Sequence, residues 1–322
     1  MLIRIYKANN PALGFSLLFI AAALWLPSIL SGKEFIYYCA SPLSKFFSLY
    51  GLFSKIISIL LIFSGAILLN ITIHQFHLLK NQSYLPGLLY VLLMSCIPET
   101  LCFHPVVLAN LFLILALRRG FQMLGDVNGS SAAFDSALFV SVASLFYFPS
   151  ALFVVFVWIS LATFRSFSIR DWFISCTGLI LPYLFTAIYY YCFGNKESFF
   201  SDYIFPGFQT DGPAEIYFLK SFYVLAAFLF IVLLISLSPL FAEMARNKAS
   251  IRSGFRLFLW FTALSVISFV MAPAGNIFHF CFAAIPLSII FSNMFLNIRQ
   301  GLSEIIFSIL IIIMVIYQWN YF

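Results

Sequence analysis

A small set of polar side chains in this apolar sequence has the chemistry to bind and transfer a charged group. Two are carboxylates and the others are imidazoles, an amine and an amide: Glu34, Glu99, His104, Lys196, Asn276 and His279. A carboxylate can take a proton from an acceptor hydroxyl, and a lysine or histidine can balance the charge of a departing phosphate. We therefore take Glu34 and Glu99 as candidate catalytic residues, and the other four as candidate substrate-binding residues for an anionic, lipid-linked substrate. The competing interpretation is that they are the hydrophilic loop residues that any membrane protein carries.

No metal or cofactor motif accompanies these residues. The six cysteines have no metal-ligand spacing. His74 and His77 could share one helix face, but no third ligand stands nearby in the sequence. A Gly-rich phosphate loop, a GxGxxG fingerprint and an HExxH zinc motif are all missing. We expect no metal site and no cofactor.

The elements that must position these residues are membrane helices. Hydrophobic residues make up 63% of the chain, charged residues 9%, and the mean hydropathy is +1.04, which no water-soluble fold can accommodate. Inside a bilayer each backbone polar group must be satisfied within its own segment, and the long apolar runs lack the alternation of barrel strands. We predict an all-α, polytopic transmembrane bundle that forms one domain over residues 1–322.

About eleven membrane spans can be counted. Two of them, Leu85 to Ile97 and Pro105 to Leu117, are shorter than the roughly 30 Å hydrocarbon core requires. The third and fourth helices are therefore expected to be short and to hold Glu99 and His104 at or just below a membrane surface. The spans are expected near residues 12–31, 52–75, 84–98, 104–118, 134–149, 150–165, 171–193, 221–241, 256–273, 276–296 and 302–319.

The basic residues predict the orientation. When the spans are threaded alternately from a cytoplasmic N-terminus, twelve of the 17 Lys and Arg residues, including every Arg, fall on the cytoplasmic side. The C-terminus then lies outside. The net charge of +6 thus reports membrane topology and contact with anionic membrane lipid, and it does not indicate a nucleic-acid partner.

Four stretches carry a family resemblance. LPGLLYVLLMSCIPE, ANLFLILALRR, FDSALFVSVASLFYFP and HFCFAAIPLSII sample about residues 84 to 292. The chain looks like an uncharacterised, polytopic inner-membrane family of Bacteroidota. More distantly, the order of these stretches resembles the GT-C superfamily of glycosyltransferases. That superfamily consists of polytopic enzymes that use polyprenyl-phosphate sugars and have an acid in the first outer loop, short third and fourth helices and a late helix of aromatic–aliphatic–Pro form.

The resemblance implies roles for particular residues. Glu34, the one acid of the first outer loop, would be the base, and Lys196 or His279 would meet the carrier phosphate. The implied location is the bacterial inner membrane, with the N-terminus cytoplasmic and the C-terminus periplasmic. Many GT-C members carry a paired acid in this loop, and this chain departs from them in having Glu34 alone.

Three functions remain open at this point. The leading one is envelope glycan assembly, in which the protein transfers, or helps to transfer, a sugar from a polyprenyl-phosphate carrier at the periplasmic face. The second is a non-enzymatic scaffold or accessory subunit of an envelope export or secretion complex, whose protein partners no motif identifies. The third is a lipid or small-molecule transporter, which would need a polar path. Whether the protein is an enzyme is left open; if it is, we expect a polyprenyl-phosphate-sugar-dependent glycosyltransferase.

Overall fold

The computed structural model describes residues 2–7, 10–31, 51–79, 82–101, 103–123, 129–164, 168–193, 220–246, 249–271 and 277–321. Within these ranges the chain forms twelve α-helices and three short 3-10 helices, and it is all-α. They are α1 (Leu2–Tyr6), α2 (Pro11–Ser31), α4 (Gly51–Gln75), α5 (Leu85–Ser95), η1 (Pro98–Thr100), α6 (Pro105–Gln122), α7 (Gly129–Phe146), η2 (Phe148–Phe153), α8 (Val154–Phe164), α9 (Ile169–Phe193), α11 (Lys220–Arg246), α12 (Ala249–Met271), η4 (Ile277–His279), α13 (Phe280–Asn297) and α14 (Gln300–Tyr321).

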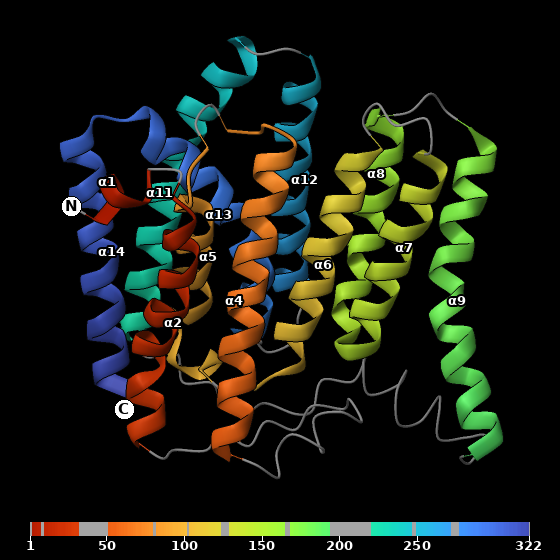
Figure 1. Ribbon diagram of the computed structural model, residues 1–322, viewed down its shortest axis with the longest axis horizontal. Coiled ribbons are helices and arrows are strands. Elements are labelled where there is room, and N and C mark those ends of the chain that lie inside the picture. The colour runs from red at the N-terminus through yellow and green to blue at the C-terminus, as the bar shows by residue number, and fades with distance from the viewer. Residues whose placement is uncertain are drawn as a thin grey trace.

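The helices form a multi-pass membrane bundle. In the described part of the chain, nine helices are long and apolar enough to span a bilayer, and the segments Leu85–Ser95 and Phe148–Phe164 are shorter apolar helices. These eleven segments correspond to the eleven expected spans. Figure 1 shows the helices standing side by side, with α14 at one edge of the bundle and α9 at the other.

The fourth span is longer than the sequence suggested. The apolar run stops before Arg118 and Arg119, but α6 continues to Gln122 and reaches 18 residues. Arginine has a long aliphatic stem, so a helix can continue past it while the guanidinium stays at the polar surface. The expectation of a short fourth helix was therefore wrong, whereas the third helix, α5, has only 11 residues.

We name the two ends of the bundle after their most informative residues. At the His104 end, α2 and α5 finish, α4 and α6 begin, and the three 3-10 helices η1, η2 and η4 lie between helices. At the Arg119 end, α4, α6 and α13 finish, and α5, α7 and α14 begin.

Helix α5 lies at the centre of the bundle, and all eleven of its residues are buried. It packs against α2, α4 and α13. Its first turn is held by α4, because the Gly87 N–H donates a hydrogen bond to Asn70 Oδ1 at 2.9 Å. A Cβ atom at Gly87 would overlap the Asn70 amide, so this close approach requires glycine.

Helix α9 is peripheral and packs mainly on α7. The buried residues of α7 are mostly Gly, Ala and Ser, and a Cβ at Gly178 of α9 would lie 2.5 Å from the Phe134 carbonyl oxygen. The Ser141 hydroxyl donates to the Leu179 carbonyl at 2.7 Å. Close backbone approach with interhelical hydrogen bonds is the usual way in which helices associate in lipid.

Candidate functional site

A buried lysine distinguishes the His104 end. Lys55, in the second turn of α4, is 6% exposed, and its Nζ donates a hydrogen bond to the Ser28 carbonyl of α2 at 2.6 Å. The Ser28 hydroxyl in turn donates to the Leu101 carbonyl at 2.9 Å. This chain of contacts joins the end of α2 and the start of α4 to the segment between η1 and α6. Lys55 therefore sits at the junction from which Glu34 follows α2 and His104 follows η1.

Sequence reasoning missed Lys55 as a site residue, although a signal for it was present. It is a lone cation inside the apolar segment Leu52–Gln75, where the expected orientation had only placed it on the outer side. Ionisable residues within membrane segments are costly and usually mark functional sites. The interpretation of Lys55 as a charged loop residue left this signal unused.

His104 is the N-cap of α6. Its backbone is extended, and its Nδ1 accepts a hydrogen bond from the Val106 N–H at 3.2 Å. Burial and, after it, the proximity of His279 lower the pKa of His104 to about 3, so the ring is neutral at pH 7. Because Nδ1 accepts, the proton of the neutral ring belongs on Nε2, which makes that nitrogen a donor. The imidazole stacks on Phe278 at 3.7 Å between ring centroids.

His279 is the last residue of η4. Its Nδ1 shares a hydrogen bond of 2.7 Å with the Ser268 hydroxyl of α12, and burial lowers its pKa to about 4. The Tyr147 ring lies 5.5 Å from the ring of His104 and 5.5 Å from the ring of His279. Two histidines that are 175 positions apart in the sequence thus contact the same tyrosine.

A buried amide holds the two histidine-bearing helices in register. Asn110 of α6 donates through Nδ2 to the Cys281 carbonyl of α13 at 2.7 Å. Asn110 is six positions after His104, and Cys281 is two positions after His279. A carbonyl in the first turn of a helix is normally used within its own helix, so this added interhelical bond is a specific constraint on how α6 and α13 meet.

The other sequence candidates are placed less fully. For Glu99 the structure describes the backbone, within η1, and η1 lies beside η4. Glu34, Lys196 and Asn276 fall outside the described residues. Of the six candidates, the structure therefore brings His104 and His279 together, and it puts the Glu99 backbone at the same end of the bundle.

Within the described ranges, no three or more His, Cys, Asp or Glu residues are grouped closely enough to hold a metal ion. His74 instead bonds through Nε2 to the Ser83 carbonyl at 3.1 Å, just before α5. The described groups at the His104 end can bind an anion through Lys55 and donate through imidazole N–H.

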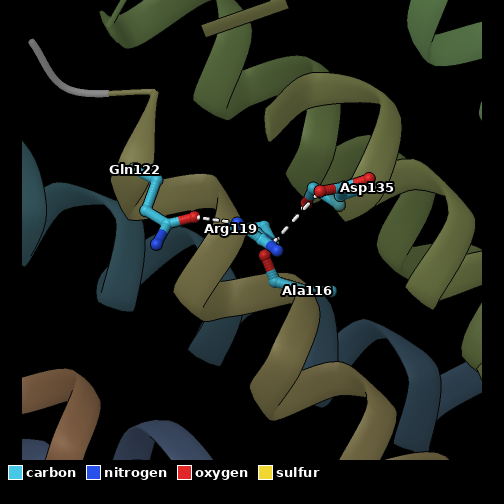
Figure 2. Close-up of polar contacts among 5 residues, drawn as sticks. Ala116, Arg119, Gln122 and Asp135 are labelled. Atoms are coloured by element: carbon cyan, nitrogen blue, oxygen red, sulfur yellow. Dashed lines mark hydrogen bonds and ion pairs between the residues drawn. The ribbon is translucent and has the colours of Figure 1, made fainter. Parts of the chain in front are cut away.

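The Arg119 end carries its polar groups differently. Figure 2 shows Arg119 between Gln122 of its own helix and Asp135 of α7. The Arg119 Nε lies 3.3 Å from Asp135 Oδ2, and Arg119 NH1 donates to Gln122 Oε1 at 2.6 Å. Both charged side chains are more than one-third exposed. Beside them, the Ser130 hydroxyl donates to Asp171 Oδ1 at 2.6 Å.

Comparisons with known proteins place the chain in a family without assigning it an activity. Neither the curated proteins nor the solved structures contain a match to this chain. The model of a family of unknown function, DUF6427, matches residues 16–321. Because that match covers nearly the whole chain, this multi-pass membrane protein belongs to the DUF6427 family.

Proposed function

We propose that the protein binds the phosphate of a lipid-linked sugar at the His104 end and takes part in envelope glycan assembly in the bacterial inner membrane. The observation that carries the proposal is Lys55, a lysine buried by protein at the junction of α2, α4 and the η1–α6 segment. The proposal includes a cytoplasmic N-terminus and a periplasmic C-terminus, so the His104 end faces the periplasm.

The electrostatics of Lys55 favour an anionic ligand. A buried ammonium loses much of its hydration and is held by polar contacts, one of which is the hydrogen bond to the Ser28 carbonyl. The first turn of α4 contains no acidic residue, and the partial positive charge of a helix N-terminus adds to the field there. A phosphodiester at the membrane surface would be attracted by this positive charge.

The chemistry we propose is a GT-C-like sugar transfer. Glu34 or Glu99 would take the proton from the acceptor hydroxyl, and Lys55 would stabilise the departing polyprenyl phosphate. His104, with Nε2 as a donor, would contribute a neutral hydrogen bond. Lys196, Asn276 and His279 stay proposed contacts to the substrate.

The test uses purified protein in proteoliposomes with labelled polyprenyl-phosphate sugars. Wild-type protein is expected to bind the carrier phosphate and to turn it over, and Lys55→Met is expected to weaken binding by about tenfold, which corresponds to roughly 1.4 kcal/mol. Methionine keeps the apolar stem, and Lys7→Met, a lysine beyond α1 near the Arg119 end, is the matched control. Loss of turnover in Glu34→Gln or Glu99→Gln, with binding intact, would assign the base.

Failure of wild-type protein to bind or transfer any of these sugars would exclude the enzymatic form of the proposal. The second candidate would then apply, namely a non-enzymatic scaffold or accessory subunit of an envelope complex. The burial and hydrogen bonding of both His104 and His279 favour this candidate, because such contacts suit structural residues. It predicts a stable partner that co-purifies equally well with wild-type protein and with Lys55→Met.

A further inference from the structure

The outward face of α12 carries two arginines one helical turn apart. Arg252 and Arg256 are both exposed, and neither forms a hydrogen bond or an ion pair in the part of the chain that the structure describes. Among the described helices, α12 is the one with two arginines at this spacing. Its first turn contains no acidic residue, so the partial positive charge of the helix N-terminus adds to that of the guanidiniums.

These arginines lie at the level of a membrane surface. Phe121, next to the last residue of α6, packs on α12, because its ring lies 5.2 Å from the ring of Phe258 and 3.3 Å from where a Cβ at Gly254 would be. These two contact positions alternate with the arginines along α12. The arginines are therefore at the depth where α6 ends, on the exposed side of α12 (Figure 1). The apolar span of α12 begins at the same level, with Arg252.

The same face continues deeper into the membrane with apolar side chains. Trp260, one turn beyond Arg256, is 51% exposed, and Ile267 and Val270 are also exposed. At 3.6 residues per turn, these three residues and the two arginines fall within about 80° of one another around the helix. The stripe thus presents charge at the surface, an indole just below it and aliphatic side chains further in. Phosphate, glycerol and acyl chains follow one another in this order in a phospholipid.

We infer that this stripe binds an anionic glycerophospholipid, whose phosphate lies between Arg252 and Arg256 and whose acyl chain lies along Trp260 and Ile267. Guanidinium groups match phosphate oxygens through their paired N–H donors, and basic side chains at a membrane surface attract anionic headgroups. The net charge of the sequence predicts contact with anionic lipid in general, and this inference gives that contact one face of one helix. It does not depend on the proposed function, which concerns the His104 end.

The combination of charge and apolar surface favours a lipid over other anions. A free phosphate would be held by the arginines alone and would leave the apolar part of the stripe without a role. An acidic protein segment would pair with the arginines at the surface, but Ile267 and Val270 lie about 15 Å or more further along the helix, at a rise of 1.5 Å per residue. A phospholipid reaches both parts at once.

Brominated phospholipids test the inference through the fluorescence of Trp260. The full-length protein is placed in nanodiscs of phosphatidylglycerol and phosphatidylethanolamine in equal amounts, with the acyl chains of one lipid or the other brominated. Bromine quenches an indole that it contacts, and the difference between wild-type protein and Trp260→Phe isolates one of the five tryptophans. Brominated phosphatidylglycerol is expected to quench Trp260 several-fold more than brominated phosphatidylethanolamine.

Two further variants assign the preference to the arginines. The double variant Arg252→Gln, Arg256→Gln is expected to abolish it, so that the two brominated lipids quench Trp260 equally. Arg170→Gln is the matched control, because it removes a single exposed arginine near the start of α9 at the same end of the bundle, and it is expected to keep the preference. An unchanged melting temperature shows that each variant is folded.

Three results would overturn the inference. The first is equal quenching by the two brominated lipids in wild-type protein, which needs no variant. The second is an unchanged preference in the folded double variant. The third is loss of the preference when inorganic phosphate is added at constant ionic strength, since that would assign the arginines to a free anion.

Discussion

The two ends of this bundle hold their basic side chains differently. At the His104 end, the lysine and both histidines are almost completely buried, and their hydrogen bonds include a backbone carbonyl, a backbone N–H and a serine hydroxyl. At the Arg119 end, the ion pair of Arg119 and Asp135 stays partly exposed to the surface.

This difference separates two kinds of polar residue in a membrane protein. A surface ion pair usually contributes only about 0–1 kcal/mol and is weakened by salt, whereas a buried polar group costs several kcal/mol when its partner is removed. The exposed pair of Arg119 and Asp135 is of the kind common at membrane surfaces, although this end also buries Asp171, which accepts a hydrogen bond from the Ser130 hydroxyl. The His104 end exceeds what an anchor in the membrane needs, and for that reason we place the function there.

The largest effect is expected from truncating the buried histidines. His104→Ala removes the cap of α6 and leaves a cavity beside Phe278 and Tyr147, and His279→Ala removes the bond to Ser268. Each change is expected to lower the free energy of unfolding by about 2–4 kcal/mol. Equilibrium unfolding of the detergent-solubilised protein measures it.

The control for the histidine variants is His77→Asn, which changes an exposed histidine at the Arg119 end and is expected to have little effect. If His104→Ala lowers the free energy of unfolding as little as His77→Asn does, the buried contacts of the His104 end do not stabilise the fold.

Lowering the pH should destabilise the protein through the two buried histidines of the His104 end. The folded-state pKa values of about 3 for His104 and about 4 for His279 lie below the ordinary value of 6.5. Between pH 6.5 and about 4 the unfolded chain therefore binds more protons than the folded chain, and stability falls as the pH falls. The melting temperature should be lower at pH 6 than at pH 7.5. This difference should be smaller in a His104→Gln, His279→Gln double variant. If the melting temperature falls by the same amount in wild type and in the double variant, the two histidines are not the cause of the pH dependence.

A smaller effect is expected at the Arg119 end. Arg119→Gln removes the ion pair with Asp135, and because both side chains are partly exposed, the loss should be about 0–1 kcal/mol. The difference from wild type should shrink further in 1 M salt, where charges are screened within about 3 Å. Asp135→Asn is the reciprocal control. A loss that is large and independent of salt would show that this end is also sensitive to its polar contacts.

The smallest change is expected to be stabilising. His77 follows α4 with a φ of 48°, and the Leu78 N–H bonds to the Ile73 carbonyl at 3.2 Å, which is the helix-ending turn that favours glycine. His77→Gly should raise stability by about 0.4–1 kcal/mol. The same unfolding measurement checks it. Gly301→Ala is the comparison variant, because nothing lies within 4 Å of a Cβ at that position. A loss of stability in His77→Gly would show that the imidazole itself makes a needed contact.

Most of the fold followed from the apolar runs in the sequence. Long hydrophobic stretches can only be helices in lipid, so the spans and the short α5 were predictable. The length of α6 was not predictable from the apolar run, which ends at the first arginine. The helix continues to Gln122, and Arg119 contacts Gln122 and Asp135.

The site was less predictable, since it depends on contacts between distant segments. Nothing in the sequence indicates that His104 and His279 meet on Tyr147, or that Asn110 reaches Cys281. Lys55 was recognisable as a charge in an apolar span, but its hydrogen bond to the Ser28 carbonyl of another helix was not. The roles assigned to Glu34, Glu99, Lys196 and Asn276 stay predictions.

The central position of α5 has a consequence for biosynthesis. α2 and α4 precede α5 in the chain, but α13, which covers another face of it, begins at Phe280, about 185 residues after α5 ends at Ser95. At a translation rate of roughly 5–20 residues per second, α5 waits about 10–40 s for that neighbour. During this interval its Tyr90 and Ser95 need temporary shelter, so the nascent chain is expected to stay beside the insertion machinery until its C-terminal third has been made.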